Sequence, residues 1–316
     1  MFSALPKNWR IHLAALGAVL FLILAFALSA PRGFPEKSLI VVKEGTGLFA
    51  LSRELSEARV IRSSFWFRAL AILMGGERDM KAGEYFFDRP QSSLRVAWRI
   101  LHGRHGIETI KLTVPEGFTI EKISGLFDGR FGYFNKKDFK ELAQEGFMFP
   151  DTYFVPITAT ASSTVKMFSD NFERRLEPLL VEIAQSGRTL DEIIKMASIL
   201  EGEAKSPEDM RIVSGILWKR LDNDIALQVD TSFAYINGKT TKELTAEDLK
   251  IKSPYNSYLY RGLPPTPISN PGLESIRAAL NPTTTPYLYF LTGDDGAMYY
   301  SRTFDEHVEK KRRLIR

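Results

Sequence analysis

The sequence predicts an α+β protein with one membrane-spanning helix near its amino terminus, then a small α+β unit and a larger α+β unit. Three observations support this organisation. Residues 11–30 contain no Lys, Arg, Asp or Glu, β-rich runs alternate with apolar residues at helical spacing, and an Asp-Gly turn separates two aromatic runs near the carboxy terminus. The predicted parts are residues 1–37 (tail, helix and linker), 38–106 (small unit) and 107–316 (larger unit).

The apolar run at residues 11–30 is long enough to cross a bilayer. Twenty helical residues rise about 30 Å, which is the thickness of the hydrocarbon core. Lys7 and Arg10 precede the run, and no acidic residue occurs before Glu36. The positive-inside rule therefore places the tail in the cytoplasm and the rest of the chain outside.

Two other interpretations of this run stay open. Ala27-Leu28-Ser29 resembles a signal-peptidase site, but the run exceeds the usual apolar region of about 7–15 residues in a signal peptide. A buried core helix is the other alternative, which the run's terminal position disfavours. A retained helix and a cleaved signal would both export the remaining chain.

The small unit is expected to contain two strands and three helices. Leu39-Ile40-Val41-Val42 and Tyr85-Phe86-Phe87 are β-rich runs. Leu48, Leu51 and Leu55 follow helical spacing, and the segments 65–74 and 94–101 are predicted to be helices.

The larger unit is expected to combine helices with antiparallel strands. Residues 110–114 alternate like a half-buried strand, and Asp294-Asp295-Gly296 is a hairpin turn between 287–291 and 298–300. The predicted helices are 120–127, 136–145, 163–185, 189–204 and 206–222.

Composition excludes several kinds of chemistry. The 316 residues include no cysteine, so disulfides and cysteine catalysis are excluded, and the net charge of +4 is too small to indicate a nucleic-acid partner. That charge suits an anionic membrane surface or wall polymer. No histidine occurs between 106 and 306, and no phosphate-binding glycine motif is present, so we expect no metal and no cofactor. Carboxylates, tyrosines and lysines remain as proton-transfer groups.

The predicted helix 189–204 carries the most specific signal. Thr189 and Glu192 form a capping-box pattern at its start. Glu201 falls in the apolar stripe of the helix, whereas Glu203 is predicted to face water. Because desolvation disfavours a charged carboxyl, a glutamate on that stripe suits general acid catalysis. A structural glutamate paired with a buried Arg or Lys is the alternative. The stripe consists of Leu190, Ile193, Ile194, Ala197 and Leu200.

The segment 253–267 is rich in tyrosine, amides and proline. Proline restricts the chain, so such a loop can be ordered without regular structure. Tyrosine faces and an asparagine amide suit a sugar, although tyrosines packed in a core would explain part of the pattern.

Five segments give the chain a resemblance to a known family. They are Val114-Pro115-Glu116-Gly117-Phe118-Thr119-Ile120, Phe149-Pro150-Asp151-Thr152-Tyr153, Ala197-Ser198-Ile199-Leu200-Glu201 with Glu203-Ala204, Leu227-Gln228 with Asp230, and 253–282 with Gly262-Leu263-Pro264-Pro265 and Asn270-Pro271-Gly272. In their order and spacing the chain resembles the endolytic murein transglycosylases of the YceG-like (MltG) family.

The resemblance implies a function for the chain. It implies cleavage of the bond between N-acetylmuramic acid and N-acetylglucosamine in nascent peptidoglycan strands, leaving 1,6-anhydromuramic acid ends, with Glu201 as the catalytic acid. It also implies a LysM-like fold for 38–106 and a single helix in the inner (cytoplasmic) membrane, with the catalytic unit on the periplasmic side. The implied partners are glycan strands, the membrane and cell-wall synthases, without nucleic acid.

Further site residues follow with less specific signals. Glu116 is expected to be a turn residue, and Gly202 and Thr231 depart from the residues common in the family. Gly202 is expected to end the helix and open room for substrate. A wall hydrolase that uses a second carboxylate, and a non-catalytic wall-binding scaffold, stay open as alternatives. The expected substrate-binding residues are Asp151, Gln228, Asp230, Tyr255, Asn256 and Tyr258.

Overall fold

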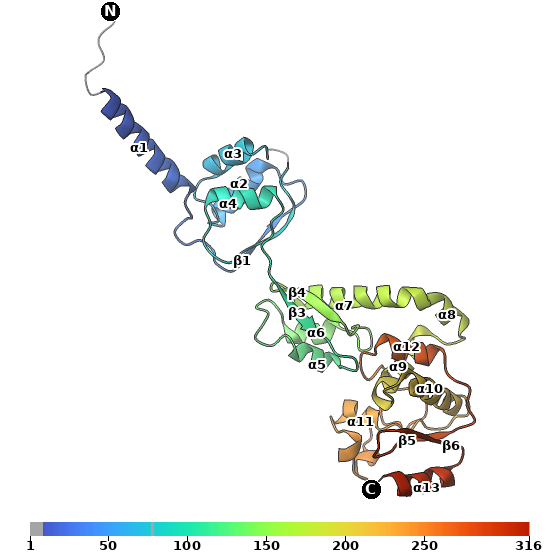
Figure 1. Cartoon of the computed structure of the whole chain (residues 1–316). Helices are drawn as coiled ribbons and strands as arrows, with labels where there is room; N and C mark the ends of the chain where they lie inside the picture. The colour runs from blue at the N-terminus through green and yellow to red at the C-terminus, as the bar shows by residue number, and fades with distance from the viewer. Residues whose placement is uncertain (1–8, 77–78, 316) are drawn as a thin grey trace, which may run out of the picture. The chain divides into compact units, whose positions relative to one another are not determined.

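The computed structural model describes residues 9–76 and 79–315 and confirms an α+β fold (Figure 1). The chain divides into two compact units, one ending at Glu108 and the other beginning at Thr109. Each of the three sheets in the described chain has two antiparallel strands.

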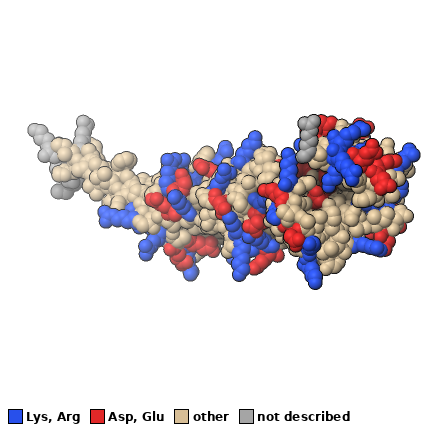
Figure 2. Space-filling view, turned by 90° about the horizontal axis from the view of Figure 1, so that it is seen from below, with Lys and Arg blue, Asp and Glu red and all other residues tan. Residues whose placement is uncertain are grey.

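The first unit begins with the long helix α1 (Trp9–Leu28). The window Ile11–Leu28 is long and apolar enough to cross a membrane, and none of it is buried within the described chain. Figure 2 shows tan along this apolar window, whereas blue and red side chains are spread over the surface beyond it. The tail before Trp9, with Lys7, lies outside the described residues.

The rest of this unit packs three helices against one two-stranded antiparallel sheet, whose strands are separated in the chain by two of the helices. Strand β1 pairs with β2 so that Leu39 lies opposite Phe86. A core of aliphatic and aromatic residues, including Leu51, Phe67 and Tyr85, fills the space between sheet and helices. The elements are β1 (Ser38–Val42), α2 (Leu48–Glu57), α3 (Ser64–Leu73), β2 (Gly83–Phe87) and α4 (Ser93–Leu101).

The second unit has two apolar clusters, which both contact Phe147. One lies beneath the β3–β4 sheet, and the other surrounds α9, which contacts α10, α11 and α12. The elements are β3 (Thr109–Thr113), α5 (Ile120–Gly125), α6 (Lys136–Leu142), β4 (Thr152–Pro156), α7 (Ala161–Leu176), η1 (Glu177–Leu179), α8 (Leu180–Gln185), α9 (Leu190–Glu203), α10 (Pro207–Asp222), α11 (Thr231–Ile236), η2 (Thr241–Glu243), η3 (Asp248–Lys250), α12 (Leu273–Leu280), β5 (Tyr289–Thr292), β6 (Met298–Ser301) and α13 (Phe304–Leu314).

Several element predictions need correction. The expected continuous helix 163–185 is interrupted at Glu177–Leu179, where Pro178 cannot donate a helical hydrogen bond. The sequence analysis missed β4, α11, α12 and α13. The hairpin around the Asp-Gly turn is confirmed, since β5 and β6 pair with Phe290 opposite Tyr300.

Candidate active site

Helix α9 positions Glu201 in its last turn. At the other end of the helix, Thr189 Oγ1 accepts the Glu192 N–H, and the Glu192 carboxylate accepts the Thr189 N–H at 2.8 Å. This reciprocal capping box starts the helix as predicted. Because Ile193, Ala197 and Leu200 are buried, the helix is held in the core and Glu201 emerges at its edge.

The Glu201 carboxylate contacts the amino-terminal end of α12. Its Oε2 accepts the Gly272 N–H at 2.8 Å and the Ser275 hydroxyl at 2.7 Å. Helix amino termini present N–H groups that lack partners within the helix, and the Glu201 oxygen satisfies one of them. In the described chain, no hydrogen bond reaches Oε1, which leaves that oxygen available to a ligand.

A turn between β3 and α5 lies against Glu201. Gly117 adopts a left-handed backbone (φ +74°), and a Cβ at this position would lie 3.3 Å from Glu201 Cγ. The Gly117 N–H donates to the Asn270 carbonyl, and Phe118 forms a β-bridge with Asn270. Glycine therefore allows this turn to close over the carboxyl-bearing end of α9.

Glu116 is part of this site as well as of the turn. Its Oε1 packs so closely on Gly272 that a Cβ there would lie 2.0 Å away. Burial, and then the charges of Glu201 and Glu274, raise the pKa of Glu116. Within the described chain, the hydrogen bonds to Glu201 come from Gly272 and Ser275, and no ion pair joins Glu116 or Glu201 to an Arg or Lys.

The asparagine before this helix terminus connects three segments. Asn270 Oδ1 accepts the Met148 N–H at 2.8 Å, and its Nδ2 donates to the Phe118 carbonyl and to Glu145 Oε1. Burial raises the pKa of Glu145 to about 7, against the hydrogen bonds from Ile120 N–H and Asn270. The sequence analysis missed Glu145, because neither periodicity nor a local motif distinguishes it.

Glu203 is only partly exposed and its carboxylate is hydrogen-bonded within the fold, which corrects the helical-wheel prediction that it faces water. Its Oε1 accepts the Thr231 N–H at 3.2 Å and the Thr231 hydroxyl at 2.8 Å. Burial raises the pKa of Glu203 to about 7. The wheel failed because α11 covers the side of α9 that would be exposed on an isolated helix.

Gly202 also has a different role from the one expected. The helix continues to Glu203, so Gly202 does not end it. A Cβ on Gly202 would lie 2.4 Å from Thr231 Cγ2. The two positions that depart from the common family residues therefore contact each other, and glycine makes room for the threonine.

The structure brings together some of the predicted substrate-binding residues. The Tyr258 hydroxyl donates to Asp230 Oδ1 at 2.6 Å, next to the Glu203–Thr231 contact. Burial and the Asp230 carboxylate raise the pKa of Tyr258. Gln228 lies two residues earlier with its side chain exposed, its left-handed backbone (φ +49°) held by a hydrogen bond to the Ser257 carbonyl.

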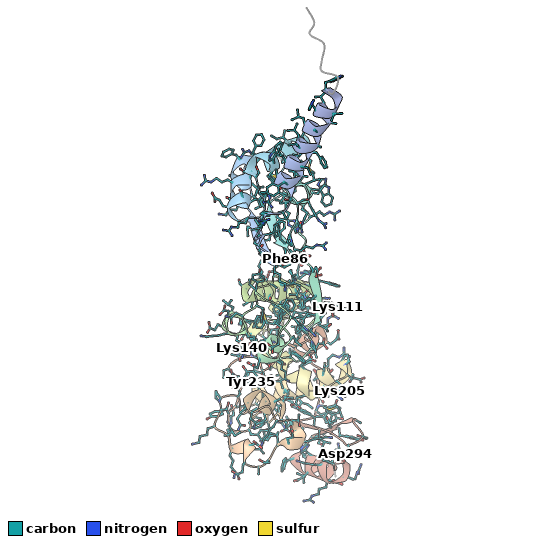
Figure 3. The ribbon with its side chains drawn as sticks, turned by 90° about the vertical axis from the view of Figure 1, so that its left-hand side faces the viewer. Phe86, Lys111, Lys140, Lys205, Tyr235 and Asp294 are labelled. Carbon is teal, nitrogen blue, oxygen red and sulfur yellow. The ribbon has the colours of Figure 1, made fainter. Side chains whose placement is uncertain are left out.

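In the tyrosine loop, the side chain of Tyr255 is half-buried, whereas that of Asn256 is buried and orders the loop. The Tyr255 hydroxyl hydrogen-bonds Thr266 Oγ1 at 2.9 Å, and its ring lies 4.8 Å from that of Tyr235, which is labelled in Figure 3. Asn256 is 0% exposed, and its Nδ2 donates to the Leu249 and Ile251 carbonyls. Its amide therefore orders the loop, and contact with a ligand would require the loop to open.

Asp151 is tied to another part of the unit. Its Oδ2 accepts from Arg175 Nη2 at 2.6 Å and from Asn171 Nδ2 at 3.1 Å, both on α7. Although burial opposes ionisation, these hydrogen bonds lower the pKa of Asp151. None of the described hydrogen bonds of its side chain reaches Glu201, Gly272 or Ser275.

A groove of about 350 Å³, open to solvent, runs along α12. Its lining includes Glu274, two residues beyond the Gly272 that holds Glu201, and continues to Asn281 at the other end of the helix. This volume is within the range of ligand sites, so the groove is large enough for sugar rings. The lining residues are Leu179, Glu182, Pro207, Arg211, Glu274, Arg277, Ala278 and Asn281.

A helix-borne glutamate held at a second helix terminus, with a second carboxyl beside it, is a site typical of enzymes that use acid–base chemistry. The chain belongs to the YceG-like family, whose sequence model matches residues 40–313.

The chain is also similar to individual proteins, two in sequence and one in structure. The chain is 27% identical over 305 residues to the endolytic murein transglycosylase of Bacillus subtilis, covering 87% of this chain and 84% of that protein. It is 25% identical to the endolytic murein transglycosylase of Streptococcus pneumoniae D39, of which it spans 56%. The crystal structure of a yceG-like protein from Listeria monocytogenes superposes with a TM-score of 0.57 at 25% identity, covering 87% of this chain and 99% of that one.

Proposed function

We propose that the protein is a membrane-anchored, endolytic peptidoglycan lytic transglycosylase that cleaves the MurNAc–GlcNAc bond of nascent glycan strands. The observation that supports it most directly is the Glu201 carboxylate, held through one oxygen by Gly272 and Ser275 while its other oxygen is free of described hydrogen bonds. The names of the relatives support the same substrate class.

The proposed reaction uses Glu201 first as an acid and then as a base. Protonated Glu201 donates its proton to the glycosidic oxygen as the bond breaks. The carboxylate then accepts the proton of the muramic acid C6 hydroxyl, whose oxygen attacks C1 of the same ring. No water is consumed, so one carboxyl is sufficient, unlike in most glycoside hydrolases. We assign the transferred proton to Oε1, because Oε2 is occupied by two donors.

The remaining residues are assigned by their accessibility. We propose that Gln228, Asp230, Tyr255 and Tyr258 contact sugar, and that the groove along α12 holds a neighbouring part of the strand. Asp151 and Asn256 are proposed only as indirect contributors, because Asp151 is tied to α7 by Asn171 and Arg175 and Asn256 is 0% exposed.

The proposed organisation follows the same division of the chain. Residues 1–37 hold a tail, a single membrane helix and a linker, 38–106 form a LysM-like domain, and 107–316 form the catalytic domain. α1 anchors the protein in the cytoplasmic membrane with the catalytic domain on the periplasmic side. Cell-wall synthases are proposed as partners because the chain belongs to the YceG-like family.

A wall hydrolase is the second candidate, and Glu116 is the observation that favours it. A carboxyl beside Glu201 could activate water, as the second carboxylate does in inverting hydrolases. The hydrolase would leave a reducing muramic acid end, whereas the transglycosylase leaves an anhydro end that is lighter by one water.

Mass spectrometry of digested peptidoglycan tests the proposal. The wild-type protein should release anhydromuramic ends, Glu201→Gln should release none, and Glu173→Gln, the same change at an exposed position on α7, should match the wild type. Reducing ends would establish the hydrolase. Full activity in a folded Glu201→Gln variant would overturn the assignment of Glu201.

A further inference from the structure

Helix α3 of the first unit is apolar on two sides. Phe67 and Ala71 point into the core and are 0% exposed. Phe65, Ile72 and Leu73 lie on the other side, at spacings of seven and eight residues, and are 62%, 52% and 84% exposed. A helix on the surface of a soluble protein normally presents a polar face to water. The exposed side of α3 therefore presents large apolar side chains to water, where polar side chains would be expected.

Contacts within this unit place the start of α3 next to the end of α1. Arg62 Nη2 donates to the Ala30 carbonyl at 2.7 Å, and its guanidinium lies 4.2 Å from the centre of the Phe26 ring. A Cβ on Gly33 would lie 3.6 Å from Arg59 Nη1. α1 and α3 also contact each other directly, and in Figure 1 α3 lies on the side of the unit from which α1 extends, with β1 on the opposite side.

The charges near this face suit a lipid surface. Arg59 and Arg62 lie where the apolar helix ends, and Figure 2 shows blue side chains beside the base of the uncharged helix. Arg68, three residues after Phe65, lies over the Phe49 ring at 4.8 Å, and Phe49 is itself largely exposed. Aromatic and aliphatic side chains flanked by arginines are typical of helices that lie in the membrane interface.

We propose that α3 is an interfacial helix that seats the first unit on the outer surface of the bilayer crossed by α1. Phe65, Ile72 and Leu73 enter the boundary between headgroups and acyl chains, and Arg59, Arg62 and Arg68 contact anionic headgroups. This inference rests on the proposed membrane anchor, and it does not depend on the catalytic activity. Its consequence is that the first unit is held at the membrane by two elements, α1 and α3.

Single-cysteine labelling of the full chain in vesicles tests this proposal. The sequence contains no cysteine, so an introduced one is the only thiol. Leu73→Cys probes α3, and Glu84→Cys is the control, an exposed position in β2 that belongs to the sheet opposite α3. Both variants are labelled with an environment-sensitive fluorophore and reconstituted in phosphatidylethanolamine–phosphatidylglycerol vesicles.

We expect headgroup-attached nitroxides to quench the Leu73 probe several-fold more than the Glu84 probe, and aqueous iodide to show the reverse order. Replacing phosphatidylglycerol by phosphatidylcholine should reduce the lipid quenching at Leu73, because the arginines then lose their anionic partners. Protein that floats with the vesicles while both probes respond equally to iodide would overturn the α3 proposal and leave the anchor intact. Protein that fails to float would overturn both. Neither result bears on glycan cleavage, which Glu201→Gln tests separately.

Discussion

At the scale of single residues, the site depends on how the two oxygens of Glu201 differ. Oε2 accepts two hydrogen bonds from the start of α12, and Oε1 accepts none from the described chain. Hydrogen bonds that fix one oxygen also fix the plane of the carboxyl, and they aim the other oxygen at the ligand. For the proposed reaction we therefore expect Ser275 to position Glu201, which the sequence did not indicate.

Removal of the Ser275 hydroxyl should affect the reaction more than the fold. In Ser275→Ala we expect kcat to fall on the order of tenfold, equivalent to about 1.4 kcal/mol in the barrier, with KM little changed. Steady-state kinetics on purified glycan strands measures both quantities. Ser162→Ala, the same change at an exposed position on α7, should leave them unaltered. A rise in KM with unchanged kcat would show that Ser275 acts in binding and not in positioning.

The raised pKa of Glu203 predicts a pH dependence of stability. Burial raises this pKa from the ordinary 4.5 to about 7, so between these values the folded state binds more protons than the unfolded state. The contribution of Glu203 to the free energy of unfolding is therefore fully present below pH 4.5 and is lost as the pH rises through 7. The loss amounts to about 3.5 kcal/mol at most, from about 1.4 kcal/mol per pH unit over the shift of the pKa.

Glu203→Gln tests this effect, since its amide oxygen can still accept both Thr231 hydrogen bonds. Urea unfolding at pH 5 and pH 8 should show that the variant gains stability relative to wild type only at the higher pH. Glu173→Gln, at an exposed position, should parallel the wild type. If the difference in unfolding free energy between Glu203→Gln and wild type were the same at both pH values, Glu203 would ionise in the folded protein without loss of stability.

At the scale of elements, the end of α9 is defined by its neighbours α11 and α12. Glu201 accepts a hydrogen bond from the start of α12, and Glu203 accepts one from the start of α11. Two glutamates separated by one residue therefore have different surroundings. Gly202 lies between them and permits the close approach of α11. A glycine within a helix usually costs about 1 kcal/mol of stability relative to alanine. Here the absence of a side chain at Gly202 makes room for Thr231.

A double-mutant cycle measures this fit. Gly202→Ala should destabilise the fold by about 1–3 kcal/mol, because the overlap with Thr231 Cγ2 outweighs the gain in helix propensity. Thr231→Ser removes that methyl group and keeps the hydroxyl that Glu203 accepts, so it should relieve most of the loss. Unfolding free energies of the four proteins supply the coupling. Additive effects would contradict a direct Gly202–Thr231 contact.

Elements whose signals are local were the most predictable ones. The α9 start was predicted because its capping box joins residues three apart, and the β5–β6 hairpin because its turn lies between its strands. In contrast, α12 has no side-chain cap from its own N-cap residue, and its start is contacted by the distant side chains of Glu201 and Glu116. Its boundary could not be derived from neighbouring residues.

At the scale of the whole molecule, the chain has two compact units, and the first of them begins with a helix long and apolar enough to cross a membrane. α1 is long, apolar and unburied within the described chain, and the retained-helix interpretation predicts that it stays in the mature protein. A signal peptide would instead be removed near Ser29.

Intact mass and membrane fractionation distinguish these two fates. Protein from cells expressing the full sequence should stay in the membrane fraction after a high-salt wash and retain peptides from α1 in its mass map. Replacing Leu20 and Leu24 by lysine should release the protein from the membrane, because two charges in the hydrocarbon region are costly. A product that begins after Ser29 would establish cleavage.

Sequence alone determined the features that depend on residues close together in the chain. They are the apolar run of α1, the α+β alternation and the capped start of α9, and the stripe and the family motifs led to the prediction of Glu201. Only the tertiary structure decided the surroundings of Glu201, because its hydrogen-bond partners lie 71 and 74 residues away. The same holds for Glu116, and for Glu203, which α11 covers. Burial and charge at a site are sums over segments that folding brings together, and no local pattern encodes them.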